Sequence, residues 1–188
     1  MQDYIFDLPH SAGNPRNSEG AFVHLQDGRI LFVYTRYNGD SWSDHASADL
    51  AAIISADDGR SWGKPAIIRQ NDAANIMSVS LLRLQDGRIA LLYLRKKALS
   101  TQLFDCRPWL CFSADEGKSW SEAKDVTGLP PAYLVINNDR LIQLRDGRLL
   151  LPAAFHRFQK ESIDSRAIAI FFISDDGGET WREAKEWV

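Results

Sequence analysis

The sequence predicts an all-β fold made of three copies of a four-stranded antiparallel unit. An octet of the form Ser-x-Asp-x-Gly-x-Ser/Thr-Trp occurs three times, and an Asp-Gly-Arg motif also occurs three times. Both motifs repeat about every 60 residues, and such a period indicates a repeat architecture. In addition, no segment shows apolar residues at the 3.6-residue spacing of a helix. The repeat is therefore the first level of organisation of this chain.

The Asp-Gly-Arg motifs, called DGR turns below, begin at Asp27, Asp86 and Asp146. Each lies between two apolar runs, namely "AFVHL" and "ILFVY", "VSLLRL" and "IALLYL", and "RLIQL" and "LLLPAAF". Asp-Gly is a strong hairpin signal because a tight turn needs positive φ angles, which Gly adopts freely and Asp tolerates. Each DGR turn therefore predicts a hairpin between the first and second strands of a unit.

The octets follow the β-rich runs "LAAIIS", "WLCFS" and "IAIFFIS" and precede the shorter runs "PAIIR", "EAKDV" and "EAKEWV". They are expected to join the third strand to the fourth. The Asp and Ser side chains can accept hydrogen bonds from the turn, the Gly permits a left-handed residue, and the Trp covers the hairpin. We therefore assign a structural role to the fixed positions: Ser55, Asp57, Gly59, Trp62, Ser113, Asp115, Gly117, Trp120, Ser174, Asp176, Gly178 and Trp181.

Four antiparallel strands repeated at a constant interval are typical of the blades of a β-propeller. The blades are expected at about residues 15–70, 71–129 and 130–188, so that the chain 1–188 forms part of a propeller. Three such units leave two open ends, which favours association. We expect either the N-terminal half of a longer protein, which the differences between the units favour, or two identical arcs related by a twofold axis.

The antiparallel order places the DGR turns and the octets at one face of the predicted disc. The DGR arginines Arg29, Arg88 and Arg148 are therefore expected to be solvated turn residues. The longer, irregular loops lie at the other face, where binding and catalysis usually occur. Its candidate site residues are Arg16, Glu19, Arg36, Asp44, Asn75, Asn138, Arg140 and His156. This polar, mixed-charge set suits a sugar or another hydroxylated anion better than an apolar ligand.

Other residues of this face have simpler interpretations as well. The segment "RKK" at 95–97 is predicted to be a solvated loop, with attraction of an acidic substrate as the alternative. The segment "NNDR" at 137–140 either hydrogen-bonds a sugar or caps a strand, and His156 is a ligand or a packed histidine. Tyr37, Tyr93 and Tyr133 are expected to have packing or rim roles.

Composition excludes several classes of partner. The net charge is −3 with no polybasic tract, which gives no electrostatic footprint for nucleic acid or an anionic membrane. No signal peptide or transmembrane segment is predicted, and the compartment is left open. The motifs indicate no metal site and no cofactor. Cys106 and Cys111 match no zinc spacing, so two buried thiols are expected, with a short-range disulfide as the alternative.

The octets resemble the Asp-boxes of sialidases and related BNR-repeat proteins, which are six-bladed propellers. The segment from Arg16 to Asp44 adds to this resemblance, because sialidases have an arginine before the first strand and an aspartate after an Arg-Tyr-Asn-like stretch. Here "RYNGDSWSD" begins at Arg36, 20 residues after Arg16. The resemblance implies that Arg16 binds the carboxylate of an acidic sugar, that Arg36 is a supporting arginine and that Asp44 is the general acid/base.

The chain departs from the sialidase pattern in two places. The sequence Arg-Asn-Ser-Glu places Glu19 where it can pair with Arg16. Sialidases also use a tyrosine nucleophile. The resemblance places that tyrosine in later blades, and no residue of this chain matches it. The function expected from the resemblance is that of the N-terminal half of an exo-glycosidase acting on a terminal acidic sugar, inactive as an isolated chain. The alternative is a non-catalytic Asp-box propeller that binds glycan or protein.

Overall fold

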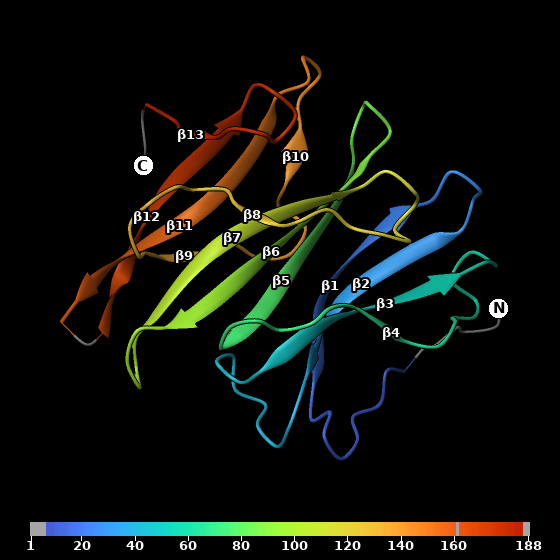
Figure 1. The fold of residues 1–188 in the computed structure, drawn as a ribbon, viewed down its shortest axis with the longest axis horizontal. Coiled ribbons are helices and arrows are strands. Elements are labelled where there is room, and N and C mark those ends of the chain that lie inside the picture. Colours follow the sequence, from blue (N-terminus) through green and yellow to red (C-terminus); the bar gives the residue numbers. More distant parts are fainter. Residues whose placement is uncertain (1–6, 161, 186–188) are drawn as a thin grey trace.

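In the computed structural model, residues 7–160 and 162–185 are described, and they contain strands and turns with no helix. Figure 1 shows three groups of strands that follow one another across the molecule, from β1–β4 through β5–β7 to β11–β13. These two ranges likewise contain no helix that could span a membrane. The expectation of an all-β chain is confirmed.

The first unit forms a complete four-stranded antiparallel sheet in the order β1-β2-β3-β4. Its strands are β1 (Asn17–His24), β2 (Ile30–Tyr37), β3 (Ala48–Ser55) and β4 (Ala66–Arg69). The DGR turn joins β1 to β2 and the octet joins β3 to β4, as the sequence predicts.

The remaining strands form one nine-stranded sheet, not two separate sheets. Its strands are β5 (Asn75–Arg83), β6 (Ile89–Ala98), β7 (Phe104–Ser113), β8 (Lys124–Asp125), β9 (Tyr133–Val135), β10 (Ile142–Gln143), β11 (Leu149–Gln159), β12 (Ser162–Ser174) and β13 (Arg182–Glu183). A single parallel bridge between Cys106 and Tyr133 joins the second unit to the third. The division into three blades therefore stays a prediction, although each strand lies within one of the expected ranges.

The third unit also differs from the expected four long strands. Its first strand is divided into β9 and β10, which pair with different parts of β11. The fourth strands β8 and β13 are each only two residues long. The last part of the expected strand "EAKEWV" lies outside the described residues.

Strand β6, in the second unit, is buried on both faces, which explains the continuous apolar run "IALLYL". Along β6, Leu91 and Tyr93 pack into the core shared with the first unit, whereas Leu92 and Leu94 pack into the core shared with the third. A smaller cluster around Tyr34 covers the outer face of the first sheet. The cores therefore lie between neighbouring units, as in a stack of blades.

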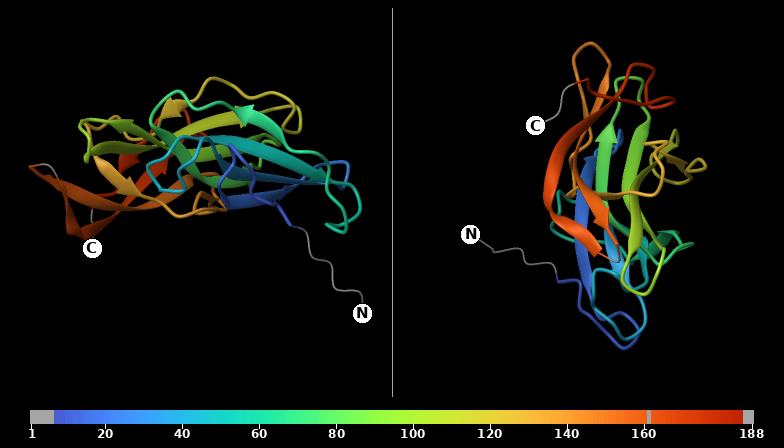
Figure 2. Two further views of the ribbon diagram at one scale, coloured as in Figure 1. Left: turned by 90° about the horizontal axis from the view of Figure 1, so that it is seen from below. Right: turned by 90° about the vertical axis from the view of Figure 1, so that its left-hand side faces the viewer.

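Figure 1 shows the DGR turns and the octets along the upper right edge of the molecule, and the loops that join the middle strands along the lower left edge. The side view at the right of Figure 2 shows the strands of the successive units running in similar directions. The separation of the two sets of loops, which the antiparallel order predicts, places the segment before β1 and the β2–β3 loop at the same edge.

Candidate functional site

An arginine and an aspartate meet at the loop edge of the first unit. Arg16 lies just before β1, and its Nη1 donates a hydrogen bond to Asp44 Oδ1 in the β2–β3 loop at 2.6 Å. The same nitrogen donates to the carbonyl oxygen of Trp42 at 3.1 Å. The guanidinium lies over the ring of Tyr37, 4.7 Å from its centroid. This arrangement is an ion pair at the surface, and the Asp44 side chain is 60% exposed.

The backbone around Arg16 is fixed by the end of β2. The Tyr37 amide donates to the carbonyl of Arg16 at 3.0 Å. The buried Asn14 side chain donates to the carbonyls of both Arg16 and Tyr37, each at 3.0 Å. These bonds hold the start of β1 against the end of β2, so the position of the Arg16 side chain is set by strand pairing.

The pair changes the ionisation of both members. The hydrogen bond from Arg16 lowers the pKa of Asp44, more than partial burial raises it. Burial lowers the pKa of Arg16, but the bond to Asp44 and the charges of Tyr37, Asp44 and Glu19 together outweigh this and leave the pKa raised. In the free protein, Asp44 is therefore an ionised carboxylate at neutral pH.

Glu19 lies beside this pair in an unusual backbone conformation. It has a φ of 53° within a β-bulge of β1 between Ser18 and Ala21. Burial raises its pKa, while Arg16 lowers it and Asp44 raises it. One carboxylate oxygen, Oε2, is buried and has no hydrogen-bond partner in the described structure. Glu19 therefore lies next to Arg16, as expected, but it is a partly buried carboxyl and Arg16 bonds to Asp44 instead.

Lys96 is a site residue that the sequence analysis placed wrongly. Its side chain is not solvated, because the residue is only 4% exposed and its Nζ donates to the carbonyl of Asp44 at 2.7 Å. Burial lowers the pKa of Lys96, although Cys106, Asp44 and Glu19 raise it. Two signals in the sequence point to this placement. Lys96 follows Leu92 and Leu94 at two-residue intervals, so it lies on the same buried face of the strand. It also lies as many residues after its DGR turn as Tyr37 and His156 lie after theirs.

Two tyrosines line the buried side of the site. Tyr37, beneath Arg16, is fully buried, and burial raises its pKa to about 12. Burial, and then the charges of Cys106 and Asp44, raise the pKa of Tyr133 to about 12. The ring of His156 meets Tyr133 edge-on at 6.0 Å, and its Nδ1 is 2.8 Å from the Asp164 carbonyl oxygen. His156 thus reaches the site only through Tyr133.

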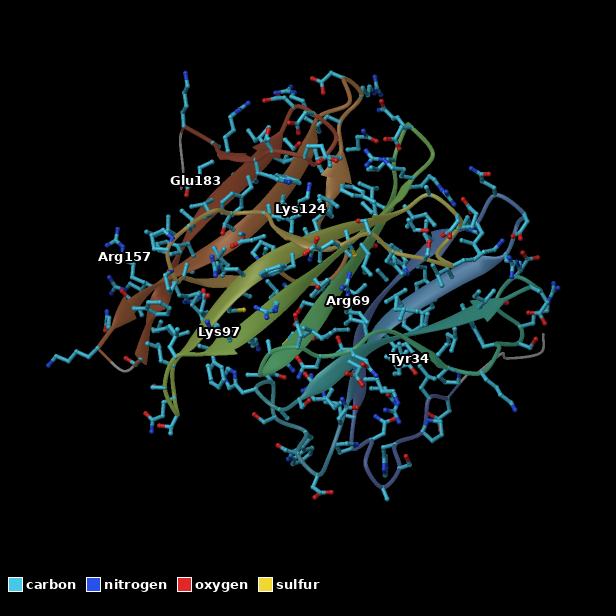
Figure 3. The ribbon with its side chains drawn as sticks, in the orientation of Figure 1. Tyr34, Arg69, Lys97, Lys124, Arg157 and Glu183 are labelled. Carbon is cyan, nitrogen blue, oxygen red and sulfur yellow. The ribbon has the colours of Figure 1, made fainter. Side chains whose placement is uncertain are left out.

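Arg36 lies apart from Asp44. Side chains alternate along β2, so Arg36 and Tyr34 face away from Tyr37. Arg36 and Tyr34 both line a cavity of about 660 Å³ at the outer face of the first sheet. Tyr34 is labelled in Figure 3. The Nη1 atom of Arg36 donates a hydrogen bond to Asn38 Oδ1 at 3.3 Å. A supporting role for Arg36 stays a prediction, and any effect on Asp44 would pass through the backbone.

The other candidate residues have structural contacts. Asn75 is fully buried, and its Nδ2 donates to the carbonyl of Ala46 at 2.5 Å. The amide of Arg140 donates to Ser80 Oγ at 2.8 Å, and its side chain lines a shallow cavity on the β11–β12 face. Asn138 lies half-buried in the turn between β9 and β10. Their roles in ligand binding stay predictions.

The octets lie at the opposite edge and have the same hydrogen bonds in each unit. In the first, the amide of Gly59 donates to Ser55 Oγ at 2.8 Å, and the Ser61 amide and hydroxyl both donate to Asp57. The glycines at the third fixed position have φ angles of 81°, 80° and 96°. The bonds from Ser61 lower the pKa of Asp57 to about 2, and the equivalent bonds do the same for Asp115 and Asp176. These aspartates are acceptors fixed within their turns.

The DGR arginines bond to their own turns, as Arg29 does to Asp27. Arg88 is less exposed than expected, because it also packs over Phe112 at 4.4 Å and donates to the Gly177 carbonyl at 3.3 Å. Both cysteines are buried free thiols, and they face opposite cores of the second unit. Within 7–160 and 162–185, no group of three His, Cys, Asp or Glu side chains is placed to hold a metal ion.

More than half of the chain matches the model of a known family. The model of the BNR repeat-like domain matches residues 71–186. This chain belongs to the BNR repeat-like family. A sialidase of Clostridium perfringens is 26% identical over 178 residues, which cover 84% of this chain and 46% of that protein. A sialidase of Paraclostridium sordellii is 25% identical over 179 residues, covering 84% of the chain and 43% of that protein.

The fold of this BNR repeat-like chain is that of the sialidase propellers. The structure of the Hadza microbial sialidase Hz136 superimposes with a TM-score of 0.73 at 19% identity, covering 91% of this chain and 37% of that one. The resemblance to the sialidase-like BNR repeat family is thus confirmed. The chain spans about half the length of the curated relatives it matches.

Proposed function

We propose that this chain forms the part of a sialidase-like exo-glycosidase that binds the acidic group of a terminal sugar and supplies the general acid/base. The observation that supports it most is the bond between Arg16 and Asp44 at the loop edge. The sialidase relatives support the class of reaction. The planar guanidinium of Arg16 suits a carboxylate, which it can bind through two parallel hydrogen bonds.

In this mechanism, the sugar carboxylate competes with Asp44 for Arg16. When the ligand occupies Arg16, Asp44 loses the hydrogen bond that lowers its pKa and gains a negative neighbour. Its pKa then rises, and a protonated Asp44 can donate to the oxygen of the leaving group. Binding of an acidic sugar therefore prepares the acid.

The tyrosine nucleophile of sialidases matches no residue of this chain, so the isolated chain is proposed to bind without hydrolysing. Tyr37 is fully buried beneath Arg16, which suits packing and not attack on a sugar. The mechanism is therefore tested in two steps, first as binding by this chain and then as hydrolysis by a form with a complete propeller.

The binding test compares Asp44→Asn with Asp40→Asn, using N-acetylneuraminic acid as the probe in titration calorimetry. Both residues are exposed aspartates of the same loop, but only Asp44 bonds to Arg16. We expect Asp44→Asn to raise the affinity about tenfold, the equivalent of one charge-assisted hydrogen bond, and Asp40→Asn to change it little. Weaker binding by Asp44→Asn than by the parent would contradict the competition.

The hydrolysis test uses an aryl sialoside and the form with a complete propeller. Replacement of Asp44 by Ala should lower kcat about 100-fold or more, the usual contribution of a general acid. Equal rates for parent and variant would remove Asp44 from the mechanism. Binding of the sugar together with no hydrolysis by either form would instead indicate the non-catalytic glycan-binding propeller.

A further inference from the structure

The loop that presents Asp44 belongs to the first unit, but the second unit holds it. Three consecutive loop residues each contact a different residue of the second unit. Lys96 Nζ donates to the carbonyl of Asp44 at 2.7 Å, the ring of Phe104 stacks on His45 at 4.3 Å, and Asn75 Nδ2 donates to the carbonyl of Ala46 at 2.5 Å.

Two of these contacts come from buried side chains, and the third comes from the half-buried Phe104. Asn75 is fully buried at the start of β5, and Lys96 is 4% exposed near the end of β6. The two residues are paired directly across β5 and β6. Phe104 begins β7, next to the turn that follows β6. Strands β5, β6 and β7 of the second unit therefore support the loop at three points.

An ammonium group in such a place requires a reason. Burial of a charged amine is unfavourable unless acceptors surround it, and a methionine of similar length would fill the space at lower cost. The Asp44 carbonyl accepts a hydrogen bond from Lys96, and the charges of Cys106, Asp44 and Glu19 favour the protonated form of the lysine. The side chain thus contributes a charge-assisted bond to the backbone of the residue that holds Arg16.

We propose that Lys96 is a positioning residue, which fixes the backbone of Asp44 so that its carboxylate faces Arg16, with Phe104 and Asn75 holding the two residues that follow. Lys96 acts through Asp44 and is not itself a catalytic residue. Its effect on hydrolysis rests on the proposed function, whereas its effect on the loop does not. The two can therefore fail separately.

The test compares Lys96→Met with Lys97→Met in the whole chain. Lys97, labelled in Figure 3, is the next residue of β6 and is exposed, so it is a matched control for loss of one lysine charge. The first readout is the NMR spectrum of His45, because a ring stacked at 4.3 Å with an interplanar angle of 2° gives ring-current-shifted signals. His45→Asn assigns these signals.

We expect Lys96→Met to return the His45 signals toward the positions of an unstacked histidine, and Lys97→Met to leave them unchanged. Amide hydrogen exchange in residues 42–47 should become about tenfold faster in Lys96→Met alone, as expected for the loss of one charge-assisted bond. Exchange in β6 and β7 should stay slow, which separates loss of the loop from loss of the fold.

A second variant, Phe104→Leu, keeps this half-buried position apolar and removes the ring that stacks on His45. It should release the same loop while Lys96 stays in place. Amide hydrogen exchange in residues 42–47 should therefore become faster in this variant as well. Unchanged exchange in both Lys96→Met and Phe104→Leu, with the fold intact, would overturn the proposal whether or not the chain acts on a sialoside. A parent-like His45 spectrum in Lys96→Met would do the same.

Discussion

The octet glycines should differ in how much they tolerate a side chain, because two of the octets pack against the preceding unit. A Cβ at Gly178 would lie 2.7 Å from Phe112 Cζ, 3.1 Å from Leu110 Cδ2 and 3.3 Å from Leu149 Cδ1. A Cβ at Gly59 would meet only Trp62, at 3.8 Å. The two glycines have similar positive φ angles, so the comparison isolates the contact between units.

The magnitudes follow from two costs. A non-glycine residue in the left-handed region costs about 1–2 kcal/mol, which applies to Gly59→Ala and Gly178→Ala alike. Overpacking adds about 1–3 kcal/mol at Gly178 alone, where Arg88 covers the Phe112 ring and limits its movement. At Gly117 the nearest atom is Leu31 Cδ2 at 2.9 Å, the end of a flexible side chain. The expected order of destabilisation is therefore Gly59→Ala, Gly117→Ala and then Gly178→Ala.

Urea denaturation followed by tryptophan fluorescence measures these differences, with the thermal midpoint as a second readout. At this chain length, each kcal/mol lowers Tm by about 2–4 °C. Gly178→Ala should therefore unfold at a clearly lower temperature than Gly59→Ala. Equal losses for the two variants would refute the packing of the third octet against the second unit.

Two further predictions concern titratable groups. The folded pKa of about 2 for Asp115 is below the unfolded value of about 3.9, so its stabilising effect is complete above about pH 4 and is lost as the pH falls toward 2. Asp115→Asn should flatten the pH dependence of the unfolding free energy in that window, and an unchanged slope in a urea series would contradict this. Burial raises the pKa of Cys106 to about 12, so its thiol should react with Ellman's reagent only on unfolding, and rapid reaction of the folded chain would show otherwise.

Much of the fold could be predicted because the repeated motifs mark turns. The DGR turns and the octets each require special φ angles, and their residue types show this directly in the sequence. The form of the first strand of the third unit could not be predicted in this way. The run "RLIQL" has the composition of an ordinary strand, but only Ile142–Gln143 of it pairs, as β10, and β9 forms earlier in the chain. Local composition says little about where pairing with β11 stops.

The site was partly predictable for a different reason. Arg16 and Asp44 meet because antiparallel order brings the segment before β1 and the β2–β3 loop to one edge, which follows from topology. Lys96 was misplaced because three consecutive basic residues suggest solvent, whereas the alternation of β6 buries only the middle one. Tyr37, Lys96 and His156 each lie ten residues after the DGR aspartate of their own unit. Alignment of the repeats would have placed them at equivalent ends of the second strands.

The first strands of the units share a backbone distortion, a left-handed residue, that no sequence motif predicts. Glu19, Ser78 and Asp139 have φ angles of 53°, 59° and 57°, and in β1 and β5 the strand pairing is interrupted at these residues. A bulge leaves a backbone group without its partner in the sheet, and a buried group must find another. The amide of Asp139 donates to the carbonyl of Val79 at 3.0 Å, and so joins the third unit to the bulge of the second.

The same distortion shapes the site. In the first unit the left-handed residue is Glu19, whose partly buried carboxyl lies beside Arg16 and Asp44. Ser78, the left-handed residue of the second unit, lies next to that carboxyl and lowers its pKa. A regular strand would alternate its side chains without interruption, so removal of the bulge would turn Glu19 to another face. The hydrogen bond between the second and third units and the position of Glu19 beside Arg16 therefore depend on one backbone feature, the left-handed residue. The octets form the hairpins at the opposite edge.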